Sequence, residues 1–182
     1  DQPLILYVNR IEKLKGMQFL LEATAEVLKT KKAHLLVVGN GSFLPEAIKL
    51  TDNLGIKHVT RFIGEVTRDE LHQIYCAADI FVNPSLDEGY SHVILEAASC
   101  GKAIIGVDHP ILREEFAING TNLVMCERGN SLSIAECIST LIADPSLRSK
   151  LGNNAREAVM SNNNMKIHIK RLLEIYKSLR GQ

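Results

Sequence analysis

Short apolar runs alternate with longer amphipathic segments along most of this chain. The apolar runs predict six strands, at residues 4–8, 34–39, 58–64, 79–84, 102–107 and 122–126. The segments between them repeat apolar side chains at helical spacing and predict helices at residues 16–31, 43–54, 67–78 and 91–101. Three more helical segments follow the last strand, at residues 131–143, 146–160 and about 163–180.

The alternation of strands and helices determines the expected fold class. A run such as HLLVVG is apolar at every position, which is typical of a strand buried on both faces in a parallel sheet. Strands that alternate with helices at this spacing predict an α/β fold, doubly wound and Rossmann-like, with a mainly parallel sheet of about six strands. At the start of segment 67–78, Thr67 followed three residues later by Glu70 predicts a capping box.

The composition fits one globular domain with a sizeable core. The chain has 182 residues, of which 46% are hydrophobic and 23% are charged. Lys and Arg together number 21, as do Asp and Glu, so the charge balance favours neither a nucleic-acid partner nor a membrane surface. No apolar run approaches the roughly 18 residues of a membrane span, and no signal peptide is visible.

The cysteines and histidines form no recognisable metal motif in the sequence. The cysteines include no Cys-x-x-Cys pair and stand mostly among apolar neighbours, so we interpret them as buried free thiols of a reducing, cytoplasmic compartment. They are Cys76, Cys100, Cys126 and Cys137. The six histidines include no His-Glu-x-x-His pattern, and we expect no metal site.

Doubly wound sheets bind ligands at the carboxyl ends of their strands. After the first strand, NRIEKLKG at residues 9–16 places Arg10 and Lys15 at that edge, where a guanidinium and an ammonium suit a diphosphate. Taken alone, this segment is explained more simply by two solvated surface cations. After the second strand, GNGS at residues 39–42 has Leu44 where a dinucleotide fingerprint needs glycine, so its glycines predict a tight turn or the close approach of a ligand.

The stretch DEGYSHVILEAASCGK, residues 87–102, carries the strongest chemical pattern. Gly89 permits a turn into a helix whose first amides favour an anion. Glu88 lies on that turn, where a carboxylate accepts hydrogen bonds from neighbouring hydroxyls, and Glu96 lies about one and a half turns into the helix. Each glutamate alone is an ordinary turn or helix-surface residue, whereas the two together at this spacing indicate a ligand. His92 and His109 are further candidates for substrate contact.

Several segments resemble the retaining glycosyltransferases of the GT-B fold known as the glycosyltransferase group 1 family. PSLDEGYSHVILEAASCGKAII resembles the Glu-x7-Glu element of that family, and RIEKLKG resembles its Arg-x4-Lys-Gly element. VVGNGS, RFIGEVTRDEL and ADPSLRSKLGNNAREAV match the usual order and spacing of the family. The resemblance runs from about residue 4 to 160 and concerns the C-terminal, nucleotide-sugar-binding domain of such enzymes.

The resemblance also implies a domain organisation. Residues 1–182 would form a single donor-binding domain with a C-terminal helix at about 163–180, and the N-terminal acceptor domain would be absent from this chain. A start at Asp1, just before the first strand, agrees with a fragment. The last helix would pack toward the other domain, or it would simply cap the core.

The family implies a role for each candidate side chain. Arg10 and Lys15 would hold the diphosphate of the donor and stabilise the leaving group. Glu88 would contact the hydroxyls of the donor sugar and complete the catalytic set. Glu96 would bind the ribose of the nucleotide, so that each sugar of the donor has one carboxylate.

Backbone groups would complete the binding site. The amides of Gly89, Tyr90 and Ser91 would meet the sugar and the phosphate, with the helix dipole behind them. The backbone near Arg61 and Phe62 would frame the base.

The implied reaction is the transfer of a hexose from a nucleoside-diphosphate sugar to an acceptor hydroxyl, with retention at the anomeric carbon. A UDP-sugar is favoured as the donor and a GDP-sugar is next. Asp-x-Asp is absent from the sequence, so we expect a metal-independent hexosyltransferase without a cofactor. The acceptor, a glycan, a lipid or a metabolite, would bind through the missing domain, and the isolated domain would be weakly active or inactive.

Three departures from the family pattern leave alternatives open. Asn9 stands where the family has glycine before the arginine, and Gly89-Tyr90-Ser91 replaces Gly-Phe-Gly. The loop from Asp108 to Glu114 replaces Gly-Gly-x-x-Glu and contains His109 and Pro110. These changes motivate a second hypothesis, a non-catalytic nucleotide-binding or interaction module that kept the fold. A dinucleotide-dependent oxidoreductase is a weaker third hypothesis, because the glycine pattern is incomplete.

Overall fold

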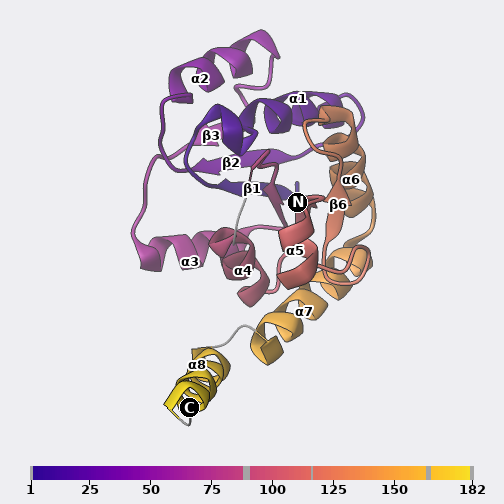
Figure 1. The fold of residues 1–182 in the computed structure, drawn as a ribbon. Coiled ribbons are helices and arrows are strands. Elements are labelled where there is room, and N and C mark those ends of the chain that lie inside the picture. The colour runs from indigo at the N-terminus through magenta and orange to yellow at the C-terminus, as the bar shows by residue number, and fades with distance from the viewer. Residues whose placement is uncertain (1, 88–90, 116, 163–164, 181–182) are drawn as a thin grey trace.

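The computed structural model describes residues 2–87, 91–115, 117–162 and 165–180, and it confirms the doubly wound α/β fold (Figure 1). Six strands form one parallel sheet in the order β3-β2-β1-β4-β5-β6. Their bounds are β1 Leu4–Val8, β2 His34–Val38, β3 Thr60–Phe62, β4 Ile80–Asn83, β5 Ala103–Val107 and β6 Val124–Cys126. All six predicted strands are therefore present, and the sheet is parallel throughout.

Helices cover both faces of this sheet (Figure 1). They are α1 Met17–Leu28, α2 Leu44–Asn53, α3 Arg68–Ala77, α4 His92–Ser99, α5 Pro110–Glu115, α6 Ser131–Ala143, α7 Pro145–Asn162 and α8 Met165–Arg180, with a 3₁₀ turn η1 at Lys13–Lys15. The sequence pattern did not indicate η1 or α5, because both are too short to show a helical period. Pro110 begins α5, where its missing N–H costs no hydrogen bond.

Alternate residues of each central strand feed two hydrophobic cores. In β1, Ile5 and Tyr7 belong to the core beneath α1 and α6, whereas Leu6 and Val8 belong to the core beneath α3, α4 and α7. Every residue of β5 is buried. This double burial is the reason that the strands are apolar at consecutive positions.

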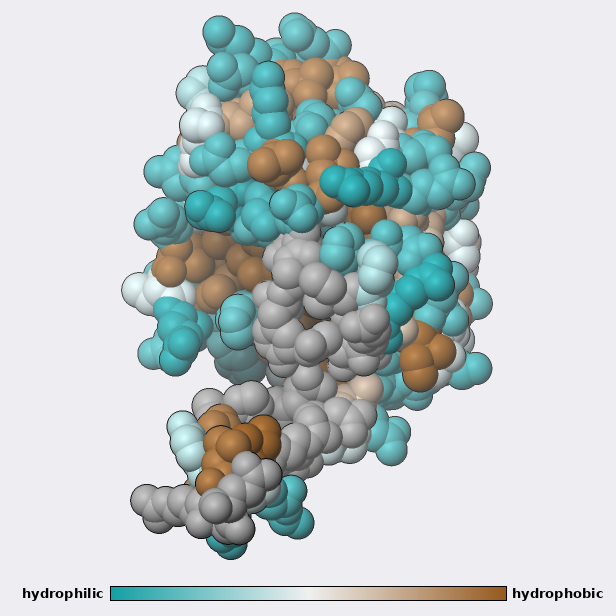
Figure 2. Space-filling model, in the orientation of Figure 1, coloured by the Kyte–Doolittle hydropathy of each residue, from teal (hydrophilic) through white to brown (hydrophobic). Residues whose placement is uncertain are grey.

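Helix α8 extends away from the sheet (Figure 1), and apolar side chains gather on it in Figure 2. Its large exposed apolar side chains are Ile169, Leu172, Leu173, Ile175, Tyr176 and Leu179. The alternative in which the last helix caps the core is therefore wrong for the described part of this helix. No helix among the described residues is both long enough and apolar enough to cross a membrane.

The expectation of four buried thiols is wrong. Cys126 is buried, but Cys100 and Cys137 are only half-buried and Cys76 is exposed. All four are free cysteines. Apolar neighbours in sequence do not bury a side chain that lies on the outer side of an amphipathic helix, as Cys76 does.

The predicted capping box at the start of α3 is present. Thr67 Oγ1 accepts a hydrogen bond from the Glu70 backbone N–H at 3.3 Å, and the Thr67 N–H donates to Glu70 Oε2 at 2.8 Å. The hydrogen bonds from the Thr67 backbone and side chain lower the pKa of the Glu70 carboxyl. The box determines where α3 begins, and α3 carries several residues of the groove described below.

Replacing Thr67 by Ala is expected to lower the free energy of unfolding by about 1 kcal/mol, because the N-cap acceptor is lost. Urea unfolding followed by circular dichroism measures the change, with Thr67→Ser as the control that keeps the oxygen. The folded-state pKa of Glu70 is lowered, so its contribution is present above the unfolded pKa and is lost as the pH falls through the folded pKa. The loss caused by Thr67→Ala should therefore shrink in acid, and a variant as stable as the wild type at neutral pH would contradict this account.

Candidate functional site

Backbone contacts join the carboxyl ends of β1, β2 and β3 into one continuous edge. The Gly39 N–H donates to the Gly64 carbonyl at 2.7 Å, and the Ile11 N–H donates to the Asn40 carbonyl at 2.8 Å. A Cβ on Gly39 would lie 2.0 Å from the carbonyl oxygen of Asn9. The glycine after β2 is thus required by a tight contact between two loops, which agrees with the first of the two interpretations of GNGS.

The loop after β1 also packs directly on the loop after β4. Gly16 has a φ of 73°, and a Cβ there would lie 2.0 Å from the carbonyl oxygen of Pro84. The Leu86 N–H donates to the Leu14 carbonyl at 2.8 Å, and Ser85 Oγ donates to the same carbonyl at 3.4 Å. The Arg-x4-Lys-Gly element is therefore held against the start of the Glu-x7-Glu element by backbone contacts.

The two candidate cations project from this double loop. Lys15 Nζ donates to the Asp87 carbonyl at 3.3 Å, so the ammonium lies beside the residue that precedes Glu88. The Arg10 side chain is exposed, while its carbonyl accepts a hydrogen bond from the Tyr7 hydroxyl at 3.0 Å. Both cations thus lie at the carboxyl end of β1, as the sequence predicts.

Glu12 and Ser42 close this loop from the side of β2, and the sequence pattern indicated neither. The Ser42 N–H donates to Glu12 Oε1 at 3.0 Å and Ser42 Oγ donates to Oε2 at 2.5 Å. These bonds, with a smaller effect of Arg10, lower the pKa of the Glu12 carboxyl. Asn9, where the family has glycine, accepts a hydrogen bond from the Arg10 N–H at 2.9 Å, so this departure leaves the loop intact.

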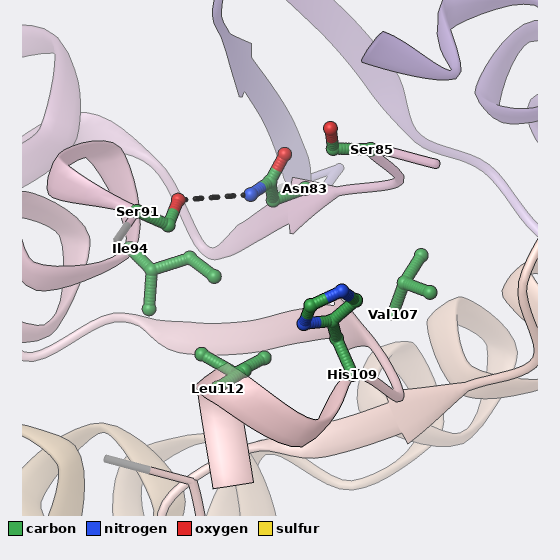
Figure 3. Close-up of a pocket in the computed structure, with 7 residues that line it drawn as sticks. All are labelled: Asn83, Ser85, Ser91, Ile94, Val107, His109 and Leu112. Atoms are coloured by element: carbon green, nitrogen blue, oxygen red, sulfur yellow. Dashed lines mark hydrogen bonds between the residues drawn. The ribbon is translucent and has the colours of Figure 1, made fainter. Parts of the chain in front are cut away.

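Ser91 is the N-cap residue of α4 and is buried at the end of β4. Its Oγ accepts a hydrogen bond from Asn83 Nδ2 at 3.1 Å (Figure 3). Within the described part of the chain, Asn83 Oδ1 has no hydrogen-bond partner, although this residue is only 4% exposed. No sequence pattern singled out Asn83, and the one available signal was a polar residue at the end of an otherwise apolar strand.

His109 reaches the same place from the loop after β5. Figure 3 shows its ring directed toward Asn83 and Ser91, and these residues line a cavity of about 10 Å³. That volume is about what one water molecule requires. The loop is held by Arg113, whose Nε and Nη2 each donate to the Asp108 carboxylate at 2.5 Å and lower its pKa.

Glu96 lies against α3. The Tyr75 hydroxyl donates to Glu96 Oε2 at 3.0 Å, and burial, together with the neighbouring carboxylate, raises the pKa of Tyr75. Both residues line a groove of about 410 Å³ between α3 and α4, together with Arg68, His72 and His92. Glu96 is thus more than an isolated surface glutamate, and its partner Tyr75 was not indicated by the sequence.

The remaining candidates lie farther along the edge or outside the described residues. Arg61 and Phe62 are in β3, the edge strand, where Arg61 is exposed and Phe62 is half-buried. Glu88, Gly89 and Tyr90 lie outside the described residues.

The described contacts therefore fall into two groups. Lys15 contacts the loop that leads to Glu88, whereas Glu96 contacts Tyr75 on α3. A doubly wound parallel sheet with cations and a helix N-terminus at its carboxyl edge defines the class of α/β domains with a Rossmann-like fold, in which ligands bind at that edge.

The comparison with known families is specific. The family model described as "Glycosyl transferases group 1" matches residues 1–158, so the chain belongs to this family. The D-inositol 3-phosphate glycosyltransferase of Frankia alni is 33% identical over 165 residues, which cover 85% of this chain and 40% of that protein. The chain spans less than half the length of the curated relatives that it matches first.

Solved structures agree with the GT-B assignment. The C-terminal domain of the glycosyl transferase group 1 family protein LpcC from Francisella tularensis superposes with a TM-score of 0.82 at 27% identity, over 90% of this chain and 89% of that one. Anabaena Alr3699/HepE in complex with UDP superposes with a TM-score of 0.90 at 22% identity, over 97% of this chain and 49% of that one. The second similarity shows the fold alone.

The contact between Gly16 and Pro84 can be tested by comparing two glycines. Gly16→Ala and Gly55→Ala both place a side chain at positive φ, 73° and 70°, which costs about 1–2 kcal/mol of unfolding free energy. Only the Cβ at position 16 meets backbone atoms, since nothing lies within 4 Å of the one at position 55. We expect Gly16→Ala to lower the free energy of unfolding by a further amount of about 1–3 kcal/mol, measured by urea unfolding. Equal losses would mean that the two loops do not depend on this contact.

Proposed function

We propose that this chain is the donor-binding domain of a retaining hexosyltransferase, which moves a hexose from a nucleoside-diphosphate sugar to an acceptor hydroxyl. The observation that carries the proposal is the packing of the Arg10–Gly16 loop on the loop after β4. It brings the Lys15 ammonium to the carbonyl of Asp87, the residue that precedes Glu88 in the sequence. A diphosphate at this edge would lie between fixed cations and a helix N-terminus.

Arg10 and Lys15 would act on the departing nucleoside diphosphate. Negative charge grows on its phosphate oxygens as the glycosidic bond breaks, and a guanidinium and an ammonium stabilise that charge. The backbone amides at the start of α4 add the partial positive charge of a helix N-terminus. These groups supply the electrostatic stabilisation in place of a metal ion, so we propose a metal-independent transfer.

The donor sugar would contact Glu88, the backbone of residues 89–91 and the loop after β5. Asn83 donates a hydrogen bond to Ser91, so the N-terminus of α4 is held against the end of β4. His109 fills part of the space where the family has only glycine backbone. The identity of the hexose therefore depends on this histidine more than on the phosphate-binding loop.

The nucleoside would extend toward Glu96, which would bind the ribose hydroxyls, and toward the backbone at Arg61 and Phe62, which would frame the base. Tyr75 holds one oxygen of Glu96 and limits its rotamers. UDP is the favoured nucleotide and GDP the next candidate, as the family resemblance implies.

The acceptor would bind on an N-terminal domain that faces this edge of the sheet. The exposed apolar side chains of α8 are suited to packing on such a domain. By itself, this chain would bind the donor weakly and transfer little, because it spans less than half the length of its relatives. The four free cysteines are compatible with a reducing, cytoplasmic location.

Calorimetric titration of this chain with UDP, GDP, ADP and NAD tests the nucleotide site. We expect one nucleoside diphosphate to bind selectively, and Lys15→Ala and Glu96→Ala each to weaken that binding at least about 10-fold, because each removes a charged partner. Lys57→Ala is the matched control, since its surface pair with Asp52 lies away from the edge. Preferential binding of NAD would revive the oxidoreductase hypothesis, and unchanged binding by Lys15→Ala would contradict the assigned diphosphate site.

The loop at His109 supports the second hypothesis, a nucleotide-binding module without transfer activity. If the ring blocks the sugar, the chain binds UDP but not a UDP-sugar. In that case, replacing His109 by Gly restores binding of the UDP-sugar and leaves the affinity for UDP unchanged. If the chain is a donor domain as proposed, the wild type binds UDP-glucose or another UDP-sugar at least as tightly as UDP. Competition between UDP and UDP-sugars in the same calorimeter separates these outcomes.

A further inference from the structure

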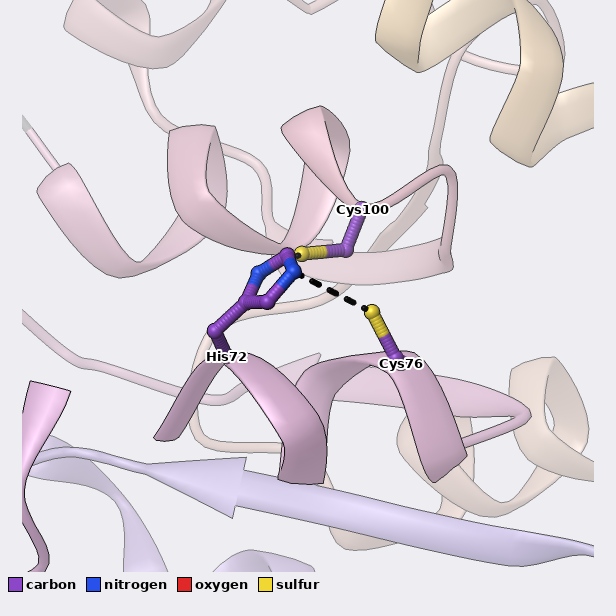
Figure 4. Close-up of side chains that lie close together, drawn as sticks. All are labelled: His72, Cys76 and Cys100. Carbon is purple, nitrogen blue, oxygen red and sulfur yellow. Dashed lines mark hydrogen bonds between the residues drawn. The ribbon is translucent and has the colours of Figure 1, made fainter. Parts of the chain in front are cut away.

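Three side chains that the donor site does not use converge at the ends of α3 and α4 (Figure 4). His72 and Cys76 lie on α3, and Cys100 follows the last residue of α4. His72 Nδ1 lies 3.6 Å from the Cys100 sulfur, and His72 Nε2 lies 3.8 Å from the Cys76 sulfur. One donor atom from each residue lies within 4.8 Å of the other two.

The three side chains of this cluster lie close enough together to form a metal ligand set after a small rotation. A tetrahedral zinc ion with Zn–N near 2.05 Å and Zn–S near 2.3 Å has N···S edges of about 3.6 Å and S···S edges of about 3.8 Å. The observed N···S separations are 3.6 and 3.8 Å. They involve different ring nitrogens, so binding through one nitrogen needs a small rotation of the imidazole or a thiol. His72 and Cys76 are exposed, which leaves room for that rotation.

The fold brings the three ligands together from two directions. His72 and Cys76 are four residues apart on one helix, so they share a face of α3. Lys102 Nζ donates to the carbonyls of Cys76 at 2.7 Å and Ala78 at 3.1 Å, which ties the turn after Cys100 to the end of α3. The cluster is therefore held by contacts that do not involve the ligand atoms themselves.

We propose that His72, Cys76 and Cys100 bind one zinc ion, with the fourth coordination position open to solvent. Two thiolates and a neutral imidazole carry two negative charges, which balance a divalent cation. Sulfur and imidazole ligands are those that zinc prefers over magnesium or calcium. The other two cysteines, Cys126 and Cys137, are not part of this cluster, so the proposed site is distinct from them.

Bound zinc would join the carboxyl ends of α3 and α4. The same two helices carry Tyr75 and Glu96, and His72 and Cys100 line the groove that these residues share. The ion would therefore stabilise the packing of α3 on α4 and the position of Glu96. It would not contact the donor phosphates, because the ligands lie on the helices and not on the loops after β1 and β4.

Proton release gives the site a pH dependence. Zinc binds the thiolate, so the metal must displace protons at neutral pH. The apparent affinity should rise with pH and fall as the solution is acidified.

Cobalt(II) provides a direct optical test. The reduced 182-residue chain is titrated with Co²⁺ under anaerobic conditions, and absorbance is recorded through the near-ultraviolet and visible ranges. Thiolate ligation produces sulfur-to-cobalt charge-transfer bands, and tetrahedral coordination produces intense visible bands. We expect both to saturate at one equivalent, to be abolished by one equivalent of Zn²⁺, and to be accompanied by a rise in Tm when zinc is bound.

Matched variants separate this site from other thiols. Cys100→Ser and His72→Gln are each expected to weaken Co²⁺ binding at least about 100-fold, because each removes a direct ligand. Loss of a residue that only hydrogen-bonds a ligand already lowers metal affinity by about 10–100-fold. Cys137→Ser and His58→Gln replace a half-buried cysteine and an exposed histidine outside the cluster and should leave binding unchanged. Circular dichroism of each variant confirms that it is folded, and His72→Gln changes an exposed residue, so a folded test variant is available.

Each other outcome overturns the proposal. Absence of charge-transfer bands in the reduced wild type would mean that the cluster is only a pair of thiol–imidazole contacts. Bands that persist in both Cys100→Ser and His72→Gln would place the metal elsewhere. Loss of the bands in Cys137→Ser with retention in Cys100→Ser would assign it to the other pair of cysteines.

Discussion

The close packing of Gly16 on Pro84, which joins the loop after β1 to the loop after β4, is the constraint on which the candidate site depends. A side chain at position 16 would overlap the Pro84 carbonyl, so the loop after β1 and the loop after β4 lie in direct backbone contact. The hydrogen bonds from Leu86 to Leu14 and from Lys15 to Asp87 follow from that approach. Because β1 and β4 are neighbours in the sheet, two elements that are about 70 residues apart in sequence form one edge of the candidate site.

A second constraint is the packing of α3 on α4. The buried hydroxyl of Tyr75 is satisfied by Glu96, so a residue of the Glu-x7-Glu element is positioned by a neighbouring helix as well as by its own. The same pair of helices brings His72, Cys76 and Cys100 together. A ligand that joins the two helices at one end would therefore restrict the position of Glu96 through the Tyr75–Glu96 hydrogen bond. It would do so without contacting a bound donor.

The part of the candidate site formed by the loop after β5 departs most from the family pattern. His109 replaces backbone with an imidazole, and Arg113 and Asp108 hold the loop that carries it. Beside it, Asn83 Nδ2 donates a hydrogen bond to Ser91 Oγ. Asn83 Oδ1 has no hydrogen-bond partner among the described residues. A buried polar atom of this kind is costly unless something binds it, which agrees with a place for a water molecule or a ligand group. In the loop after β1, the departure at Asn9 is accommodated locally, since its side chain accepts a hydrogen bond from the Arg10 N–H.

The amino-acid pattern alone predicts the six strands, most of the helices, the capping box at Thr67 and the candidate elements around Lys15 and Glu96. Those features depend on local spacing, because burial on both faces makes a strand apolar throughout and burial on one face gives a helix its period. Only the tertiary structure decided the rest. Tyr75, Asn83 and the His72 cluster act through partners from other segments, and Cys76 is exposed despite its apolar neighbours. Contacts of that kind arise from sheet order and helix packing, which no short stretch of sequence encodes.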